Sequence, residues 1–290
     1  MSEDRENKNA IFTQNLPPGV DPRMPRTTAA EKAKADFGLD VPHELVPLPS
    51  AGKVYPADSS LHGRETIEIK AMTTKEEDIL TSRALLKKGT VISELIKSCL
   101  IDKSINSLDM LSGDRNALMV AIRITGYGPE YDVEMECGEC GAKAPRTFNL
   151  AELPIKRLDA DPVLPGSNLF EFVLPMSKKA VRFKFMTGRD EEDMSALSDK
   201  QKKLNLGTES NITTSLLYSI VSVDGVEDKS KIANFIKVMP ARDSLALRKY
   251  MRDAEPGIIM KQEVECPACN HIEEVNMPLG VTFLWPSTDG

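Results

Sequence analysis

The chain has few of the residues and motifs that mark an enzyme. It contains three histidines and one tryptophan, and aromatic residues make up only 5% of it. It has no Gly-x-Ser-x-Gly, no glycine-rich phosphate loop and no His-Glu-x-x-His. No histidine stands near a convincing nucleophile, which leaves little material for acid–base catalysis. The sequence therefore predicts a protein without enzymatic activity.

Long apolar runs are also missing. No stretch approaches the ~18 residues of a membrane-spanning helix, and the first eight residues lack the apolar core of a signal peptide. A formal net charge of −7 disfavours nonspecific binding to nucleic acid, which needs clustered Lys and Arg. These absences predict a protein made in the cytoplasm, without membrane insertion and without a nucleic-acid partner.

What is present is an ordinary folded composition and an unusual set of cysteines. The 290 residues are 41% hydrophobic and 28% charged, which is typical of a globular chain with room for two domains. Four of its five cysteines form two Cys-x-x-Cys pairs, and each pair follows an alternating, strand-like run. The four are Cys137, Cys140, Cys266 and Cys269. Two such turns can supply the four thiolates that Zn²⁺ prefers, so the sequence predicts a zinc ribbon.

Other interpretations of the pairs are a metal-free knuckle and a redox site. A redox Cys-x-x-Cys is expected where a strand enters a helix, whereas these pairs are flanked by strands. In a reducing cytoplasm, thiolates on a metal are favoured over structural disulfides. His271 follows the second pair closely, but Ala142 holds the matching place in the first, which favours four sulfurs. Cys99 stands apart, at an apolar position, and is expected to be a buried filler.

The two pairs lie in segments that resemble each other. An offset of 129 carries Asp114 onto Asp243, Arg123 onto Arg252 and each cysteine of the first pair onto one of the second. Upstream, residues 69–77 align with residues 183–191 at an offset of 114, and residues 95–98 with 216–219 at 121. Similar segments in the same order indicate an internal duplication in which only loop lengths changed.

The expected fold is α+β: two duplicated helical units, each ending in a Cys-x-x-Cys knuckle hairpin, with the knuckles paired into a zinc-ribbon-like pseudo-twofold centre. We expect an extended N-terminal arm over residues 1–47, a first copy over 48–155, and a second copy with a C-terminal tail over 156–290. The elements expected in the two copies are strands at 65–72 and 170–186, the latter a hairpin turning at 177–179, and helices at 75–86, 91–100, 112–126, 190–204, 211–222, 229–238 and 243–254. Residues 28–37 are the only helical stretch expected in the arm. Ser112 is the expected N-cap of the helix at 112–126.

Carboxylates crowd the knuckles. They are Glu134, Glu136, Glu139, Glu263 and Glu265. They would repel phosphate, which disfavours the alternative of a nucleic-acid-binding zinc ribbon. Four cysteines would also close the coordination shell, which disfavours a catalytic zinc.

Several short segments resemble a known family. They are the stretch Leu48-Pro-Ser-Ala-Gly-Lys-Val-Tyr-Pro56, the strand at 69–72, the helix start at 76–80, the helix at 96–99 and the first knuckle. Together they are similar to the baseplate hub protein family of T-even-type contractile-tailed phages. The resemblance is most specific from Leu48 to about Leu150 and weaker in the second copy, although Phe283-Leu-Trp-Pro286 also looks like the family's ending.

The resemblance implies a non-enzymatic structural or assembly component of the virion tail baseplate, made in the host cytoplasm. Its implied partners are other baseplate hub, tail tube or tape-measure subunits. Within this reading, an assembly chaperone absent from the mature virion is the first alternative.

Overall fold

The computed structural model describes residues 34–203, 211–277, 279 and 281–285. The chain divides into two units, Met1–Val41 and Pro42–Gly290. In the first unit, the helix expected at 28–37 lies mostly outside the described residues, and residues 34–37 are helical. Lys34 Nζ contacts Asp40 Oδ2 at 2.5 Å across the end of that turn. No helix in the described part of the chain is long and apolar enough to cross a membrane.

The second unit begins with a hairpin covered by helices. Strand β1 (His43–Pro47) pairs antiparallel with β2 (Thr66–Lys70), so residues 43–47, expected in the arm, belong to a sheet. The following elements are α3 (Thr74–Thr81), α4 (Arg83–Lys88), α5 (Val91–Cys99), the 3₁₀ turn η1 (Ser107–Asp109) and α6 (Ser112–Tyr127). Ile67 and Ile69 alternate with exposed Thr66 and Glu68, so one face of the hairpin is buried.

A second helical region follows after residue 156. Strands β6 (Phe170–Val173), β7 (Ala180–Phe183) and β8 (Ile220–Val223) form an antiparallel sheet in the order β6-β7-β8. Its helices are α7 (Gly188–Lys203), α8 (Asn211–Ser219), α9 (Lys229–Val238) and α10 (Ala241–Ala254). Phe170, Phe183 and Phe185 pack their rings together, with centroids 4.6 to 5.8 Å apart, and are at most 2% exposed.

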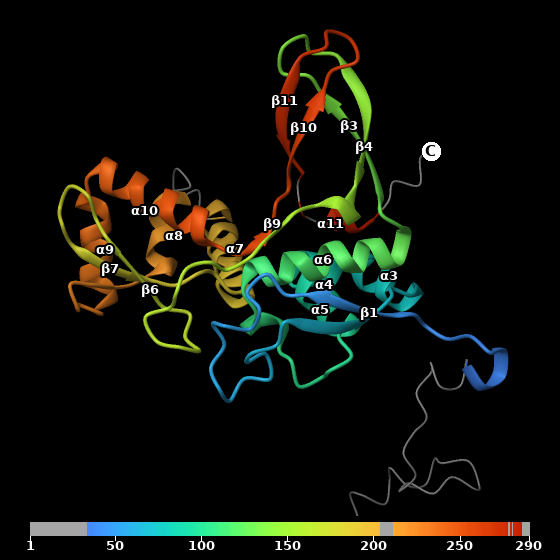
Figure 1. Ribbon diagram of the computed structural model, residues 1–290, viewed down its shortest axis with the longest axis horizontal. Helices are drawn as coiled ribbons and strands as arrows, with labels where there is room; N and C mark the ends of the chain where they lie inside the picture. The colour runs from blue at the N-terminus through green and yellow to red at the C-terminus, as the bar shows by residue number, and fades with distance from the viewer. Residues whose placement is uncertain (1–33, 204–210, 278, 280, 286–290) are drawn as a thin grey trace, which may run out of the picture. The chain divides into compact units, whose positions relative to one another are not determined.

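Two further hairpins extend from these helical regions (Figure 1). They are β3 (Glu130–Glu136) with β4 (Lys143–Asn149), and β10 (Lys261–Glu265) with β11 (Ile272–Asn276). Short β5 (Ile155–Lys156) pairs with β9 (Gly257–Ile258), so the chain leaving one hairpin meets the chain entering the other. The 3₁₀ turn η2 (Leu150–Glu152) follows β4, and α11 (Val281–Leu284) packs against α6. Mixed helices and small antiparallel sheets confirm the α+β class.

Three expected elements differ from the structure. The helix expected at 75–86 is broken at Ser82, whose ψ of 105° separates α3 from α4. The helix expected to reach 222 ends at Ser219, because Ile220–Val223 joins the sheet as β8 beside β7. Ser112 was the expected N-cap of α6, but Leu111 caps it, and the Ser112 N–H instead donates to the Met186 carbonyl. The last two differences arise from pairing with distant segments, which overrides local preference.

Helices α3 and α7 begin in the same way. Thr73 caps α3 in a box with Glu76, and Lys70 Nζ lies 2.7 Å from the Glu76 carboxylate. At the start of α7, Thr187 N and Oγ1 donate to Asp190, and Lys184 Nζ lies 2.7 Å from the same carboxylate. The acidic runs therefore anchor strand-to-helix turns, as a helix N-terminus favours.

Glu76 makes the stability of this turn depend on pH. Burial alone would raise the pKa of its carboxyl, but hydrogen bonds from Lys70, Ser98 and Thr73 lower that pKa to about 2. A depressed carboxyl pKa stabilises the fold above the unfolded value near 4.5. The stabilisation is lost as the pH falls from there towards 2, and is on the order of 3 kcal/mol.

We therefore expect Glu76→Gln to lower the free energy of unfolding at neutral pH and to flatten its fall in acid. Urea titrations across this pH range measure both effects. Exposed Asp78 on the same helix supplies the control Asp78→Asn. If the two variants show the same acid dependence as the parent, Glu76 does not carry it.

Candidate metal centre

The two Cys-x-x-Cys turns have the same backbone structure. Cys137 N donates to the Ala142 carbonyl and Gly141 N to the Cys137 carbonyl, at 3.0 and 2.9 Å. In the second turn the Cys266 and Asn270 N–H groups make the equivalent bonds, each 2.8 Å long. Gly141 and Asn270 both have positive φ, 67° and 56°, which these two residue types tolerate best. Both turns therefore present two sulfurs from one end of a hairpin.

The four sulfurs of these turns lie together. Each Sγ is within 4.8 Å of the other three. Across the hairpins, Cys137 Sγ is 3.8 Å from Cys269 Sγ, and Cys140 Sγ is 3.7 Å from Cys266 Sγ. These distances are far longer than the ~2.05 Å of a disulfide. A tetrahedron with Zn–S bonds of about 2.3 Å has sulfurs roughly 3.8 Å apart, so the cluster fits zinc.

The surroundings of the sulfurs are partly closed. Cys137 and Cys266 are buried, whereas Cys140 and Cys269 are exposed. N–H groups of Ala268 and Cys269 point to Cys266 and lower the pKa of its thiol to about 6. Such backbone donors stabilise a thiolate, the form that binds metal.

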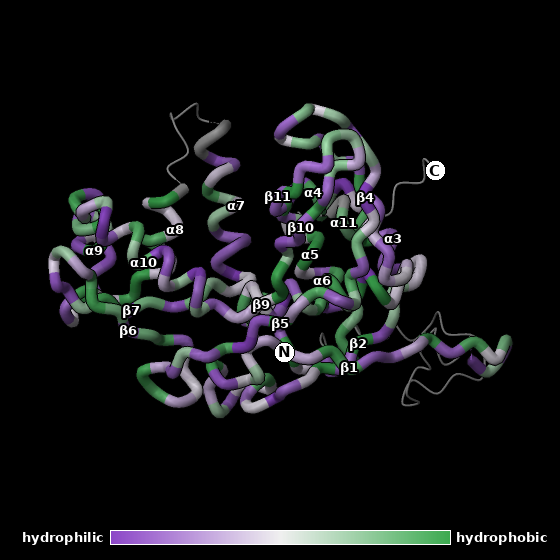
Figure 2. The backbone as a smooth tube through the Cα atoms, turned by 45° about the horizontal axis from the view of Figure 1, so that its top comes forward, coloured by the Kyte–Doolittle hydropathy of each residue, from purple (hydrophilic) through white to green (hydrophobic). Residues whose placement is uncertain are grey.

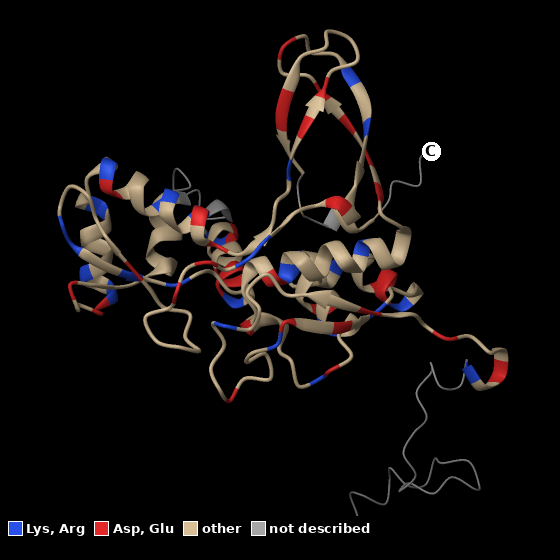
Figure 3. Cartoon of the chain, viewed as in Figure 1, with Lys and Arg blue, Asp and Glu red and all other residues tan. Residues whose placement is uncertain are grey.

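The hairpins have an apolar interior and an acidic exterior. Tyr131, Val133, Met135, Val264 and Val275 are partly buried and pack against the core. The alternate positions of β3 and β10 are exposed and mostly acidic, as Figure 3 shows along these strands; they include Glu130, Asp132, Glu134, Glu136, Glu263 and Glu265. The two hairpins, β3 with β4 and β10 with β11, together form a module that has a small core and a negative surface.

The other candidate ligands lie elsewhere. Among the described residues, the metal-compatible cluster consists of the four cysteines. His271 contributes its carbonyl to the turn, His43 contacts Glu68 at 3.2 Å, and His62 Nδ1 lies 2.6 Å from the Tyr55 carbonyl. Cys99 is fully buried at the end of α5, where burial raises the pKa of its thiol to about 12.

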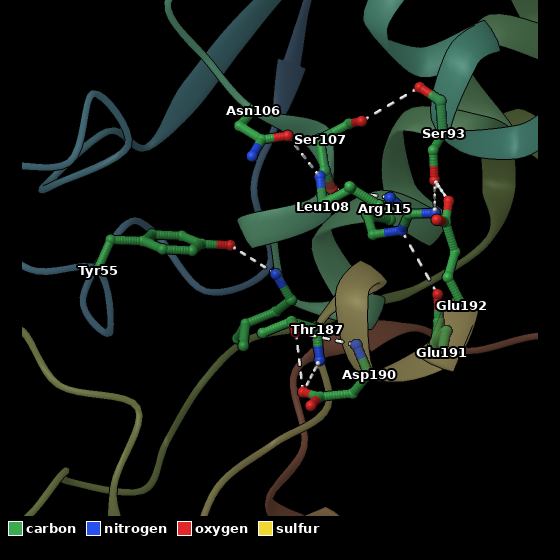
Figure 4. Close-up of polar contacts among 11 residues, drawn as sticks. Tyr55, Ser93, Asn106, Ser107, Leu108, Arg115, Thr187, Asp190, Glu191 and Glu192 are labelled. Carbon is green, nitrogen blue, oxygen red and sulfur yellow. Dashed lines mark hydrogen bonds and ion pairs between the residues drawn. The ribbon is translucent and has the colours of Figure 1, made fainter. Parts of the chain in front are cut away.

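A polar joint that the sequence did not reveal connects the two helical regions (Figure 4). Arg115 on α6 is 3% exposed. Its guanidinium donates to the Ser107 carbonyl at 2.7 Å and Ser93 Oγ at 3.0 Å, and lies 3.4 Å from Glu191 of α7. Ser93 also donates to Glu192. Because α7 is largely hydrophilic (Figure 2), its attachment to α6 depends on such polar contacts.

Close backbone approach completes this joint. Gly188 N donates to the Met110 carbonyl at 3.0 Å, and a Cβ on Gly188 would lie 2.3 Å from Arg115 Nη1. Neither Gly188 nor Arg115 belongs to a recognisable motif. The only sequence signal is an arginine at helical spacing with apolar residues such as Leu118 and Ile122, and its role becomes clear once its partners are known.

The Leu48–Pro56 stretch wraps a buried carboxylate. Asp114 is fully buried and accepts hydrogen bonds from Ser50 N, Ser50 Oγ and Tyr55 Oη, at 2.9, 2.5 and 2.5 Å. Gly52 has φ 71°, and a Cβ there would lie 2.3 Å from Arg64 N. The motif thus folds as a tight loop over the first turn of α6.

Comparisons with known proteins agree with the resemblance in this stretch. A family model described as T4 bacteriophage base plate protein matches residues 43–285. Searches of curated proteins and of solved structures give no match. The family match begins at β1 and ends at Trp285, and so includes both hairpins and both helical regions. The chain belongs to the T4 bacteriophage base plate protein family.

Proposed function

We propose that this chain is a non-enzymatic structural or assembly component of the tail baseplate hub, whose two halves are clasped by one zinc ion. The family supports a structural or assembly role in the phage tail. The observation that carries the zinc clasp is the four-sulfur cluster. Its ligands come from hairpins far apart in the chain, with Cys137 and Cys269 only 3.8 Å apart.

Corresponding contacts support a duplicated origin of the halves. Lys70, Thr73 and Glu76 make the same interactions as the residues 114 positions later, Lys184, Thr187 and Asp190. The duplication proposed here also pairs Asp114 with Asp243. Asp114 accepts from the main chain after the Leu48-Pro segment, and Asp243 accepts from Met176 N and Ser177 N after Leu174-Pro.

Zinc suits a structural role in this setting. When bound, it supplies a closed four-thiolate shell that cross-links the two hairpins, with roughly 10 kcal/mol available from ligation. The turns hold two sulfurs each by backbone hydrogen bonds, so the chain positions its ligands in advance. Glutamates around the turns keep phosphate away, which disfavours the alternative of a nucleic-acid-binding ribbon.

The proposed place of the chain is the hub, where hub, tail tube or tape-measure subunits would be its neighbours. This part of the proposal rests on the resemblance of the Leu48–Pro56 stretch and the first knuckle to the hub protein family. Two joined but nonidentical halves offer two different surfaces, which suits a subunit that joins different neighbours. An assembly chaperone absent from the finished particle is the alternative, because the same surfaces would serve transient contacts.

Affinity purification of a tagged copy from infected cells, with metal analysis of the recovered complex, tests the proposal. We expect hub, tube or tape-measure subunits to be recovered together with about one zinc per chain. Recovery of a metal-free chain without tail proteins would refute it. Immunoblotting of purified virions separates the two roles, because a chaperone is absent from them and a structural subunit is present.

A further inference from the structure

The two hairpins leave a groove along one of their sides. Each hairpin is a separate two-stranded sheet. Between β4 and β10 lies a cavity of about 400 Å³, with Thr147 and Asn149 on one wall and Glu263 and Glu265 on the other. Among the described strands, β4 pairs only with β3 and β10 only with β11. The groove is therefore bordered by two unpaired strand edges.

The register shows which backbone groups point into it. In the first hairpin, Cys137 pairs with Ala142 and Pro129 with Leu150 through hydrogen bonds. Because hydrogen-bonded pairs alternate along an antiparallel ladder, Thr147 and Asn149 direct their N–H and C=O groups away from β3. In the second hairpin, the bonds Cys266 to His271 and Met277 to Met260 leave Glu263 and Glu265 facing away from β11.

The opposite side of the module is bridged instead. The carboxylate of Glu273 on β11 accepts from Gly138 N in the first knuckle, with both oxygens 3.3 Å away. At the positions related by the offset of 129, Ala144 stands in place of Glu273 and has no carboxylate. Pro267 stands in place of Gly138 and has no N–H. The same bridge therefore cannot form beside β4 and β10, and that side stays open.

The open groove has a charge preference. Its walls carry Glu152, Glu263 and Glu265 against a single cation, Arg146. An extended segment with lysine or arginine at alternate positions would complement these walls and pair its main chain with the free edges.

We propose that the groove between β4 and β10 binds an extended, basic segment of another tail protein by strand addition. This rests on the structural role proposed above and names the chemistry of one partner. The free edges supply main-chain hydrogen bonds, and the glutamates select the partner's charge. The same glutamates disfavour pairing of the open edges with a second copy of the chain, because that copy would be equally acidic.

Binding of a synthetic peptide by the full chain tests this. The probe is a fluorescent peptide of alternating lysine and valine, as long as the seven-residue β4, followed by anisotropy. We expect saturable binding, weakened about tenfold or more by Glu263→Lys with Glu265→Lys. The matched control is Glu134→Lys with Glu136→Lys, which adds the same charge on β3 at the corresponding positions and should change the Kd less than about twofold.

A second peptide with N-methyl groups on alternate backbone nitrogens keeps the charge and removes strand pairing. We expect it to bind at least about tenfold more weakly. Equal binding of both peptides, or equal loss in both double variants, would overturn the proposal in favour of diffuse charge attraction. If the chain forms dimers and the double variant Glu263→Lys with Glu265→Lys dissociates them, the groove binds a second copy of the chain instead. The zinc content of each variant shows whether the metal centre is intact, and circular dichroism shows whether the variant is folded. Both measurements separate a loss of peptide binding from a failure of the metal centre.

Discussion

Replacing Cys137 and Cys269 with alanine is expected to abolish zinc binding and to release the two hairpins from each other. The reason is the small interior of the module: most apolar residues of the hairpins, such as Val133, Met135 and Val264, are only partly buried, so apolar packing alone gives little stability. Structural zinc sites of this kind contribute on the order of 10 kcal/mol. Mass spectrometry of the metal and hydrogen exchange of β3, β4, β10 and β11 measure the two effects.

Cys99→Ala provides the control for this experiment. Cys99 is buried, like Cys137, but lies outside the sulfur cluster, so its loss should leave the zinc content unchanged. We expect helices α5 and α6 to keep their protection in both variants, because the core of that region does not include the hairpins' sulfurs. Undiminished zinc after loss of Cys137 and Cys269 would refute the assignment.

Gly113→Ala is expected to cost about 3 kcal/mol or more of the free energy of unfolding. Gly113 lies in the first turn of α6, where a Cβ would stand 1.8 Å from the Pro256 carbonyl oxygen and 2.8 Å from its carbon. Those atoms are backbone at the entry to β9, so relief requires α6 and β9 to separate. The pairing of β9 with β5 would be strained by the same movement. Urea unfolding measures the loss.

Gly126→Ala is the matched control within the same helix. Its Cβ would meet the Met72 side chain, at 2.7 Å from Cε, which is the flexible end of a long chain. Both substitutions gain about 1 kcal/mol of helix propensity. We therefore expect Gly126→Ala to change stability by no more than about 1 kcal/mol. Similar losses in the two variants would show that backbone contact at Gly113 does not limit the packing.

Local signals predicted much of the secondary structure. Lys229–Val238 was expected as a helix with these bounds and forms α9, because Asp228 caps it and its apolar residues recur at helical spacing. The hairpin expected around residues 177–179 forms between β6 and β7. Failures occurred where distant segments decide the outcome. Residues 220–222 were expected to continue the preceding helix. Ile220–Val223 instead forms a strand, because it pairs with β7.

The candidate site likewise has features that local sequence signals predicted and features that depend on contacts between distant segments. The amino-acid sequence by itself determined the four cysteines, their turns and the acidic strands around them, because a Cys-x-x-Cys knuckle is a local structure with its own hydrogen bonds. Tertiary structure alone decided that the sulfurs of the two turns meet within 4.8 Å. It also decided that Arg115 joins α6 to α7 and that, among the described strands, one edge of β4 and one edge of β10 have no partner. These features depend on how segments more than 70 residues apart pack, as from Arg115 to Glu191, and sequence periodicity carries no information on such distances.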